Sequence, residues 1–197
     1  LSAKGETAVQ LLKRLDAILE LPKFSVMNVE RIPHRAYADL LERYCEMLYE
    51  YYQDRLVGIL LLGSVARGDW DRNSDVDLLL VVEGWEGKFV WERTRELLRL
   101  KRRLEKTEEH KAALKKGYLP IIQHYPLSKT EALKPHRTYI DACIDGIVLY
   151  EKGNFLTTVL RTTRDTLTSQ GARRILVPGK GYYWVLKEVK AGEAFEF

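Results

Sequence analysis

The chain has 197 residues, of which 46% are hydrophobic and 30% are charged, and its formal net charge at pH 7 is +4. This composition excludes a disordered chain and is typical of a globular protein with one substantial domain and at most a small appendage. No apolar run approaches the ~18 residues that a membrane span needs, and the N-terminal residues lack the apolar core of a signal peptide. We therefore expect a cytoplasmic protein without a membrane segment.

The spacing of apolar residues predicts helices that alternate with strands along most of the chain. Helices show the 3.6-residue period of an amphipathic face, and strands are short apolar runs bounded by turn residues. The predicted helices are Thr7 to Glu20, His34 to Gln53, Lys88 to Lys116, Ser128 to Leu133 and Asn154 to Ser169. The predicted strands are Leu56 to Leu62, Val76 to Glu83, Leu119 to Tyr125, Ile147 to Tyr150, Arg174 to Val177 and Tyr182 to Lys187, of which the last two form a β-hairpin.

This order of elements predicts three parts. Residues 1–33 hold an N-terminal helix and a connector, residues 34–135 form the core, and residues 136–197 form an extension with a helix and a hairpin. The alternation of helices and strands predicts an α/β or α+β fold, with a short mixed sheet flanked by helices.

The most informative passage ends with two acids, Asp75 and Asp77, at the start of an apolar strand. Because successive strand side chains alternate between faces, both carboxylates point to the same side. Two such carboxylates repel each other unless a cation lies between them, and hard oxygen ligands suit Mg²⁺ or Mn²⁺. The acids therefore predict a divalent metal site at the solvent-facing end of the strand.

The turn before these acids predicts the other half of the site. Gly63 and Gly68 permit backbone torsions that a Cβ atom would block, and Ser64 offers a hydroxyl at the start of a short helical turn. The N–H groups of this turn can face an anion, and Arg67 adds a positive charge. Each half alone has a purely structural alternative, an ordinary turn or a solvated strand end. Together they form the arrangement that phosphoryl and nucleotidyl transfer need.

The string GSVARGDWDRNSDVDLLLVV resembles the signature of the DNA polymerase β-like nucleotidyltransferase superfamily, especially its small prokaryotic and archaeal "minimal" members. The resemblance implies the nucleotidyltransferase fold. It also implies that Gly63 and Ser64 bind the triphosphate of an NTP and that Asp75 and Asp77 are catalytic residues that bind the divalent ions. Arg67 would be a phosphate or structural contact. Minimal members often accompany a small helical protein, so the resemblance allows a protein partner.

One departure from the family pattern concerns a third carboxylate, which active members usually carry on the following strand. No Asp or Glu occurs on that predicted strand, and Gln123 is expected at the position. A neutral amide coordinates Mg²⁺ poorly and is not a base at neutral pH. His124 should point to the opposite face of a regular strand, although a bulge would bring it within reach of the acids. Asp69 and Asp71 in the loop before Asp75 are other candidates.

Two functions are compatible with this site. The first is Mg²⁺-dependent transfer of a nucleoside monophosphate from an NTP to an unidentified hydroxyl acceptor, with release of pyrophosphate. The second is a catalytically weak or inactive module that binds nucleotide and metal and acts with a partner protein. Nucleic acid is allowed as a partner but is not favoured, because the basic clusters are not interleaved with aromatic residues.

Overall fold

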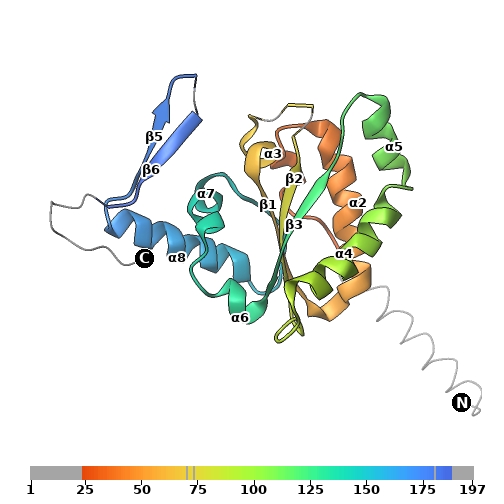
Figure 1. Cartoon of the computed structure of the whole chain (residues 1–197), viewed down its shortest axis with the longest axis horizontal. Helices are drawn as coiled ribbons and strands as arrows, with labels where there is room; N and C mark the ends of the chain where they lie inside the picture. Colours follow the sequence, from red (N-terminus) through yellow and green to blue (C-terminus); the bar gives the residue numbers. More distant parts are fainter. Residues whose placement is uncertain (1–23, 70, 73, 180, 188–197) are drawn as a thin grey trace, which may run out of the picture.

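The computed structural model describes residues 24–187 except 70, 73 and 180 (Figure 1). The helix predicted over Thr7 to Glu20 therefore lies outside the described residues. Within the described ranges, the chain forms a mixed four-stranded sheet with helices on both faces, so the predicted fold class is confirmed. No helix in these ranges is both long and apolar enough to cross a membrane.

The sheet has the strand order β3-β2-β1-β4. Its strands are β1 (Leu56–Leu62), β2 (Val76–Val82), β3 (Ile122–Ser128) and β4 (Ile147–Glu151). β1 pairs antiparallel with β2 and β4, whereas β2 and β3 run parallel. All of β1 and nearly all of β2 is buried, which explains why both are continuous apolar runs rather than alternating ones. β4 lies beyond residue 135 in the chain, yet it completes this sheet.

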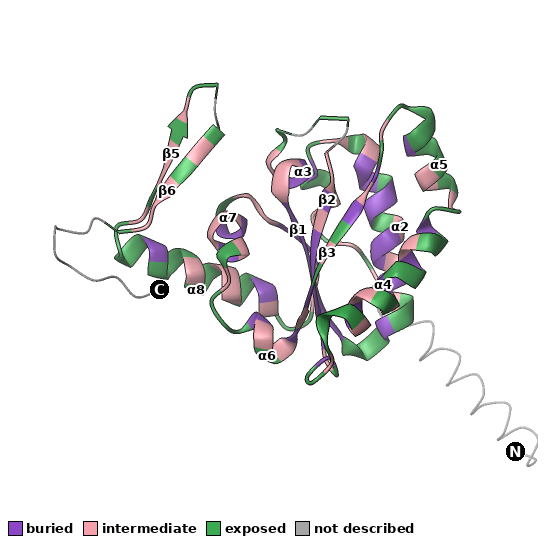
Figure 2. Ribbon diagram, viewed as in Figure 1, coloured by how far each residue is buried: buried purple, intermediate pink, exposed green. Residues whose placement is uncertain are grey.

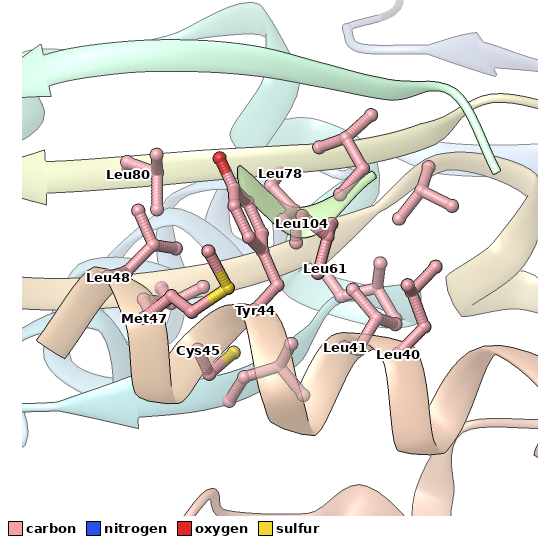
Figure 3. Close-up of a cluster of buried hydrophobic side chains, with 14 of the residues drawn as sticks. Leu40, Leu41, Tyr44, Cys45, Met47, Leu48, Leu61, Leu78, Leu80 and Leu104 are labelled. Atoms are coloured by element: carbon pink, nitrogen blue, oxygen red, sulfur yellow. The ribbon is translucent and has the colours of Figure 1, made fainter. Parts of the chain in front are cut away.

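Helices cover both faces of the sheet, so the purple strands in Figure 2 are buried from two sides. The main helices are α2 (Arg35–Tyr52), α4 (Val90–Leu104), α5 (Glu108–Lys115), α6 (Lys129–Ala132), α7 (Arg137–Asp145) and α8 (Phe155–Ser169). One hydrophobic cluster joins the sheet to α2 and α4, and Figure 3 shows part of it around Tyr44 and Leu48 of α2. A second cluster joins the other face to α6, α7 and α8. The ends of the strands therefore remain as the place for a polar site.

The single helix predicted over Lys88 to Lys116 is wrong, because the structure divides it into α4 and α5. The Thr107 hydroxyl donates to the Leu104 carbonyl at 2.8 Å and accepts from the His110 N–H at 3.3 Å. Thr107 therefore ends α4 and caps α5. These two hydrogen bonds stabilise the break more than a continuous helix would stabilise the segment. The break lets α5 pack back against α2 and bury Ala113.

The third strand also differs from its prediction, since β3 begins at Ile122 rather than at Leu119. Pro120 has no N–H to donate to a neighbouring strand. The Ile121 N–H instead bonds to the Leu119 carbonyl at 2.8 Å, in a tight local turn. Regular pairing with β2 starts only after this turn.

The C-terminal part contains the predicted helix and hairpin. After α8, strands β5 (Arg173–Val177) and β6 (Gly181–Val185) pair antiparallel as a separate two-stranded sheet. Figure 1 shows this hairpin rising at the end of α8, apart from the main sheet.

Candidate active site

The turn between β1 and β2 contains a short helix, α3 (Gly63–Arg67), that begins directly where β1 ends. Gly63 has φ +71° and Gly68 has φ +88°, a left-handed conformation that glycine adopts without strain. Gly63 also lies so close to the Asp77 carboxylate that a Cβ atom there would overlap with it. Glycine at this position therefore permits both the turn and its close approach to β2.

Asp75 precedes β2, and Asp77 is the second residue of the strand. Both acids are half-buried. Gln123 is the neighbour of Asp77 in the parallel pairing of β2 and β3, and its side-chain Nε2 donates to Asp75 Oδ2 at 3.1 Å. The expected place of Gln123 is therefore confirmed. Because Gln123 is level with Asp77 and bonded to Asp75, the two acids share one side of the sheet.

The pKa of the Asp77 carboxyl is raised, because burial disfavours its charged form and the Asp75 charge repels it. A hydrogen bond from the Tyr125 hydroxyl and the positive charge of Arg67 lower this pKa in turn. The raised pKa shows that these neighbours compensate the negative charge only in part. A cation bound at the acid pair would complete the compensation.

The acid pair fits a divalent ion by the chemistry of its donors. In the part of the chain that the structure describes, no group of three or more His, Cys, Asp or Glu side chains could hold a metal ion. Mg²⁺, however, is commonly bound through one or two carboxylates, with water and substrate phosphate oxygens as its other ligands. Asp75 and Asp77 could supply these two carboxylate ligands.

A pocket of about 170 Å³ lies next to Asp77, between α3, the strand ends and α7. The residues that line it are Leu62, Gly63, Arg67, Asp77, Tyr125, Thr138, Asp141, Ala142, Asp145 and Gly146. Three of the predicted site residues, Gly63, Arg67 and Asp77, are thus brought together around one pocket. Ser64 follows Gly63 in α3, and Asp75 lies outside the pocket lining, against Gln123.

Sequence reasoning missed the polar residues that α7 contributes to this pocket. Thr138, Asp141 and Asp145 recur at helical spacing and lie on one face of α7. The Thr138 hydroxyl is buried and has no hydrogen-bond partner among the described residues. The polar face of this helix is visible in the sequence, but its position opposite α3 depends on the tertiary fold. Tyr125, on β3, was missed for the same reason.

The other candidates for the third carboxylate position lie elsewhere. Asp69 accepts a hydrogen bond from Arg67 Nε at 3.1 Å, and the Asp71 N–H donates to Ser74 Oγ at 2.8 Å. His124 faces the opposite side of the sheet, where it is bonded to the Tyr44 hydroxyl at 2.8 Å. Burial lowers the pKa of His124 to about 4, so its imidazole is neutral at pH 7. The orientation expected of His124 on a regular strand is confirmed, and the pairing of β2 with β3 contains no bulge that would bring His124 to the acids.

A family model described as a nucleotidyltransferase domain matches residues 40–142, which include every predicted site residue. No curated protein matches the chain. Among solved structures, a candidate nucleotidyltransferase from Sulfolobus solfataricus is 18% identical, with a TM-score of 0.38, over 63% of this chain and 84% of that one. A toxin–antitoxin complex with AMP-PNP and a mutant of the toxin–antitoxin MntA-HpeT are each 15% identical, with a TM-score of 0.36, over 66% of this chain and 91% of theirs. These structural scores are too low to carry an argument, so the assignment rests on the family model.

Proposed function

The chain belongs to the nucleotidyltransferase family, and on that premise we propose that it moves a nucleoside monophosphate from an NTP to a hydroxyl acceptor and releases pyrophosphate. The observation that carries this proposal is the contact between Gly63 and the Asp77 carboxylate. Because of this contact, the turn that we propose for the triphosphate lies against Asp77, one of the two acids that we propose for the metal. The metal of this proposal is Mg²⁺, with Mn²⁺ as its alternative.

In this mechanism the turn and the acid pair have different tasks. The N–H groups of Gly63 and Ser64 and the guanidinium of Arg67 bind the phosphates and hold them beside β2. Asp75 and Asp77 hold the divalent ion, which when bound neutralises charge on the phosphate oxygens. The pocket beyond Asp77 offers polar groups to the acceptor, including the Thr138 hydroxyl. Rate enhancement then comes from positioning and from electrostatic stabilisation.

The test is transfer of label from an α-³²P-labelled NTP in the presence of Mg²⁺ or Mn²⁺. The acceptor is sought by adding, in separate reactions, the small-molecule, RNA and protein fractions of a bacterial extract. Labelled product and pyrophosphate are expected with the wild-type chain and not with Asp77→Asn. Asp71→Asn is the matched control, because Asp71 lies in the loop that precedes β2 and does not line the pocket.

The alternative function, a nucleotide- and metal-binding module that works with a partner protein, has one specific observation in its favour. The Gln123 amide occupies the position beside the acids and donates to Asp75, where a carboxylate would be a metal ligand and a base. Under this alternative, calorimetry detects NTP and metal binding that depends on Asp77, and no fraction yields labelled product.

A further inference from the structure

The C-terminal hairpin is attached to the wall of the candidate site through α7. Trp184 Nε1 donates to Asp141 Oδ1 at 2.8 Å, and the Arg174 guanidinium forms a two-pronged ion pair with the Asp145 carboxylate. Both acids line the pocket next to Asp77. The hairpin is therefore anchored to the side of α7 that faces the site, although it forms a separate sheet.

The ring of Tyr182 connects this anchor to α3 on the opposite side of the pocket. The Arg67 Cζ atom lies 5.6 Å from the centroid of the ring, and the Arg174 Cζ atom lies 4.7 Å from it. Both distances fall within the range of a cation–π contact. Tyr182 does not itself line the pocket. Its contacts with the pocket lining run through Arg67 and through Asp141, which accepts a hydrogen bond from the Tyr182 hydroxyl.

Arg67 is held in place at one end of its guanidinium group. Its Nε donates to Asp69 Oδ2 at 3.1 Å, and its side chain is 23% exposed. Among the residues that the structure describes, the two Nη groups of Arg67 have no hydrogen-bond partner. These donors are therefore available to a ligand in the pocket that Arg67 lines.

We propose that Tyr182 is a positioning residue, whose ring holds the Arg67 guanidinium in the orientation that binds the phosphates of an NTP. This inference rests on the proposed function. A free arginine side chain loses rotamer freedom when it binds a phosphate, whereas one that is already ordered loses less. The ion pair between Arg174 and Asp145 keeps the ring in place, so the hairpin contributes to nucleotide affinity without touching the nucleotide.

The experiment is calorimetric titration of the full chain with ATP in the presence of Mn²⁺. Tyr182→Leu is expected to weaken ATP binding by about 3- to 10-fold, the range of a partly buried cation–π contact. Tyr182→Phe loses the hydrogen bond to Asp141 but keeps the ring, and because the proposal assigns the effect to the ring it is expected to bind like the wild type. Tyr183→Leu is the matched control, because this neighbour is 52% exposed on the other face of the hairpin and should leave affinity unchanged.

A double-mutant cycle tests whether Tyr182 acts through Arg67. In an Arg67→Gln background, Tyr182→Leu is expected to cause no further loss of affinity. An equal loss in both backgrounds would overturn the proposal, because the ring would then act on another group. Thermal denaturation checks that each variant folds. If Tyr182→Leu does not fold, Arg174→Gln releases the ring from its other side and is expected to weaken ATP binding similarly, and wild-type affinity in that variant would overturn the proposal.

The same titrations separate this inference from the proposed function. If the wild type binds ATP in a manner that depends on Asp77 while Tyr182→Leu binds equally well, only the role of Tyr182 is wrong. If the wild type shows no affinity for ATP, GTP, CTP or UTP with Mn²⁺ or Mg²⁺, both the proposed function and the role of Tyr182 are wrong.

Discussion

The two sides of the pocket are built in different ways. On one side, Gly63 and Asp77 come from a single turn and the strand that follows it, and their contact is a consequence of that local geometry. On the other side, Asp141 is bonded to a residue 43 positions away in the chain, Trp184 of the hairpin. The comparison teaches that the first side is built by local geometry and the second by long-range contacts; in the proposed function, the first would carry the groups for phosphate and metal and the second would shape the space for the acceptor. We expect substitutions on the two sides to have effects that differ in size and in kind.

The largest effect is expected from Asp77→Asn. Removal of this charge takes away a proposed metal ligand, so nucleotidyl transfer should fall by about 10²-fold or more. Label transfer from α-³²P-labelled NTP measures this loss. A variant that retains full activity would show that the catalytic group lies on the other side of the pocket.

Gly63→Ala should destabilise the same side of the pocket, because it strains the backbone of the turn. The left-handed φ of +71° and the overlap with Asp77 together are expected to cost about 2–4 kcal/mol of unfolding free energy. Denaturant unfolding measures the cost. Gly153→Ala is the control, because it has a similar φ of +61° but nothing within 4 Å of an added Cβ atom. The difference between the two variants isolates the contact with Asp77, and equal costs would show that the contact is not energetically important.

Gln123→Glu tests the neutral side chain beside the acids. A carboxylate here could serve as a further metal ligand, so Mn²⁺ affinity should rise by about 10-fold. Calorimetry with Mn²⁺ measures the gain, and Gln170→Glu, at the residue that follows α8, controls for the added charge alone. An unchanged affinity would mean that the third ligand of the ion comes from elsewhere, and α7 would then be the first place to search.

Asp141→Asn tests the α7 side, where we expect a smaller effect. The substitution weakens the contact with Trp184 and changes the charge of the pocket wall, but it leaves the turn and the acid pair intact. Transfer activity should fall by only about 2- to 5-fold, because the asparagine amide oxygen can still accept the hydrogen bond from Trp184 and only the charge is lost. A loss as large as that of Asp77→Asn, measured in the same assay, would remove the distinction between the two sides.

The smallest effect concerns stability and pH. Because the pKa of Asp77 is raised in the folded chain, the unfolded chain loses this proton first as pH rises, and the folded state becomes less stable. Asp77→Asn should therefore raise the melting temperature at pH 7. The gain should vanish below about pH 3, where the carboxyl is protonated in both states. A gain that is independent of pH would show that the charge is not its cause.

Local sequence patterns were enough to predict much of this molecule. The continuous apolar runs of β1 and β2 predicted buried strands, and the glycines and acids between them predicted the turn and the side of the sheet on which the acids lie. These predictions succeeded because strand alternation and the torsions open to glycine are set by a few neighbouring residues. The helix break at Thr107 and the late start of β3 were missed because single hydrogen bonds decided them.

The far wall of the pocket was beyond prediction from the sequence alone. The pattern of Thr138, Asp141 and Asp145 shows a polar helix face, and the alternation of Tyr182 with Tyr183 shows a two-faced strand. Neither pattern predicts which residues the polar helix face or either face of the strand contacts. Only the tertiary structure brings Tyr182 to Arg67. In it, β4 follows α7 and joins the main sheet, and α8 then leads to the hairpin that contains Tyr182. The physical reason is that such contacts depend on which apolar surfaces are buried together across the whole chain.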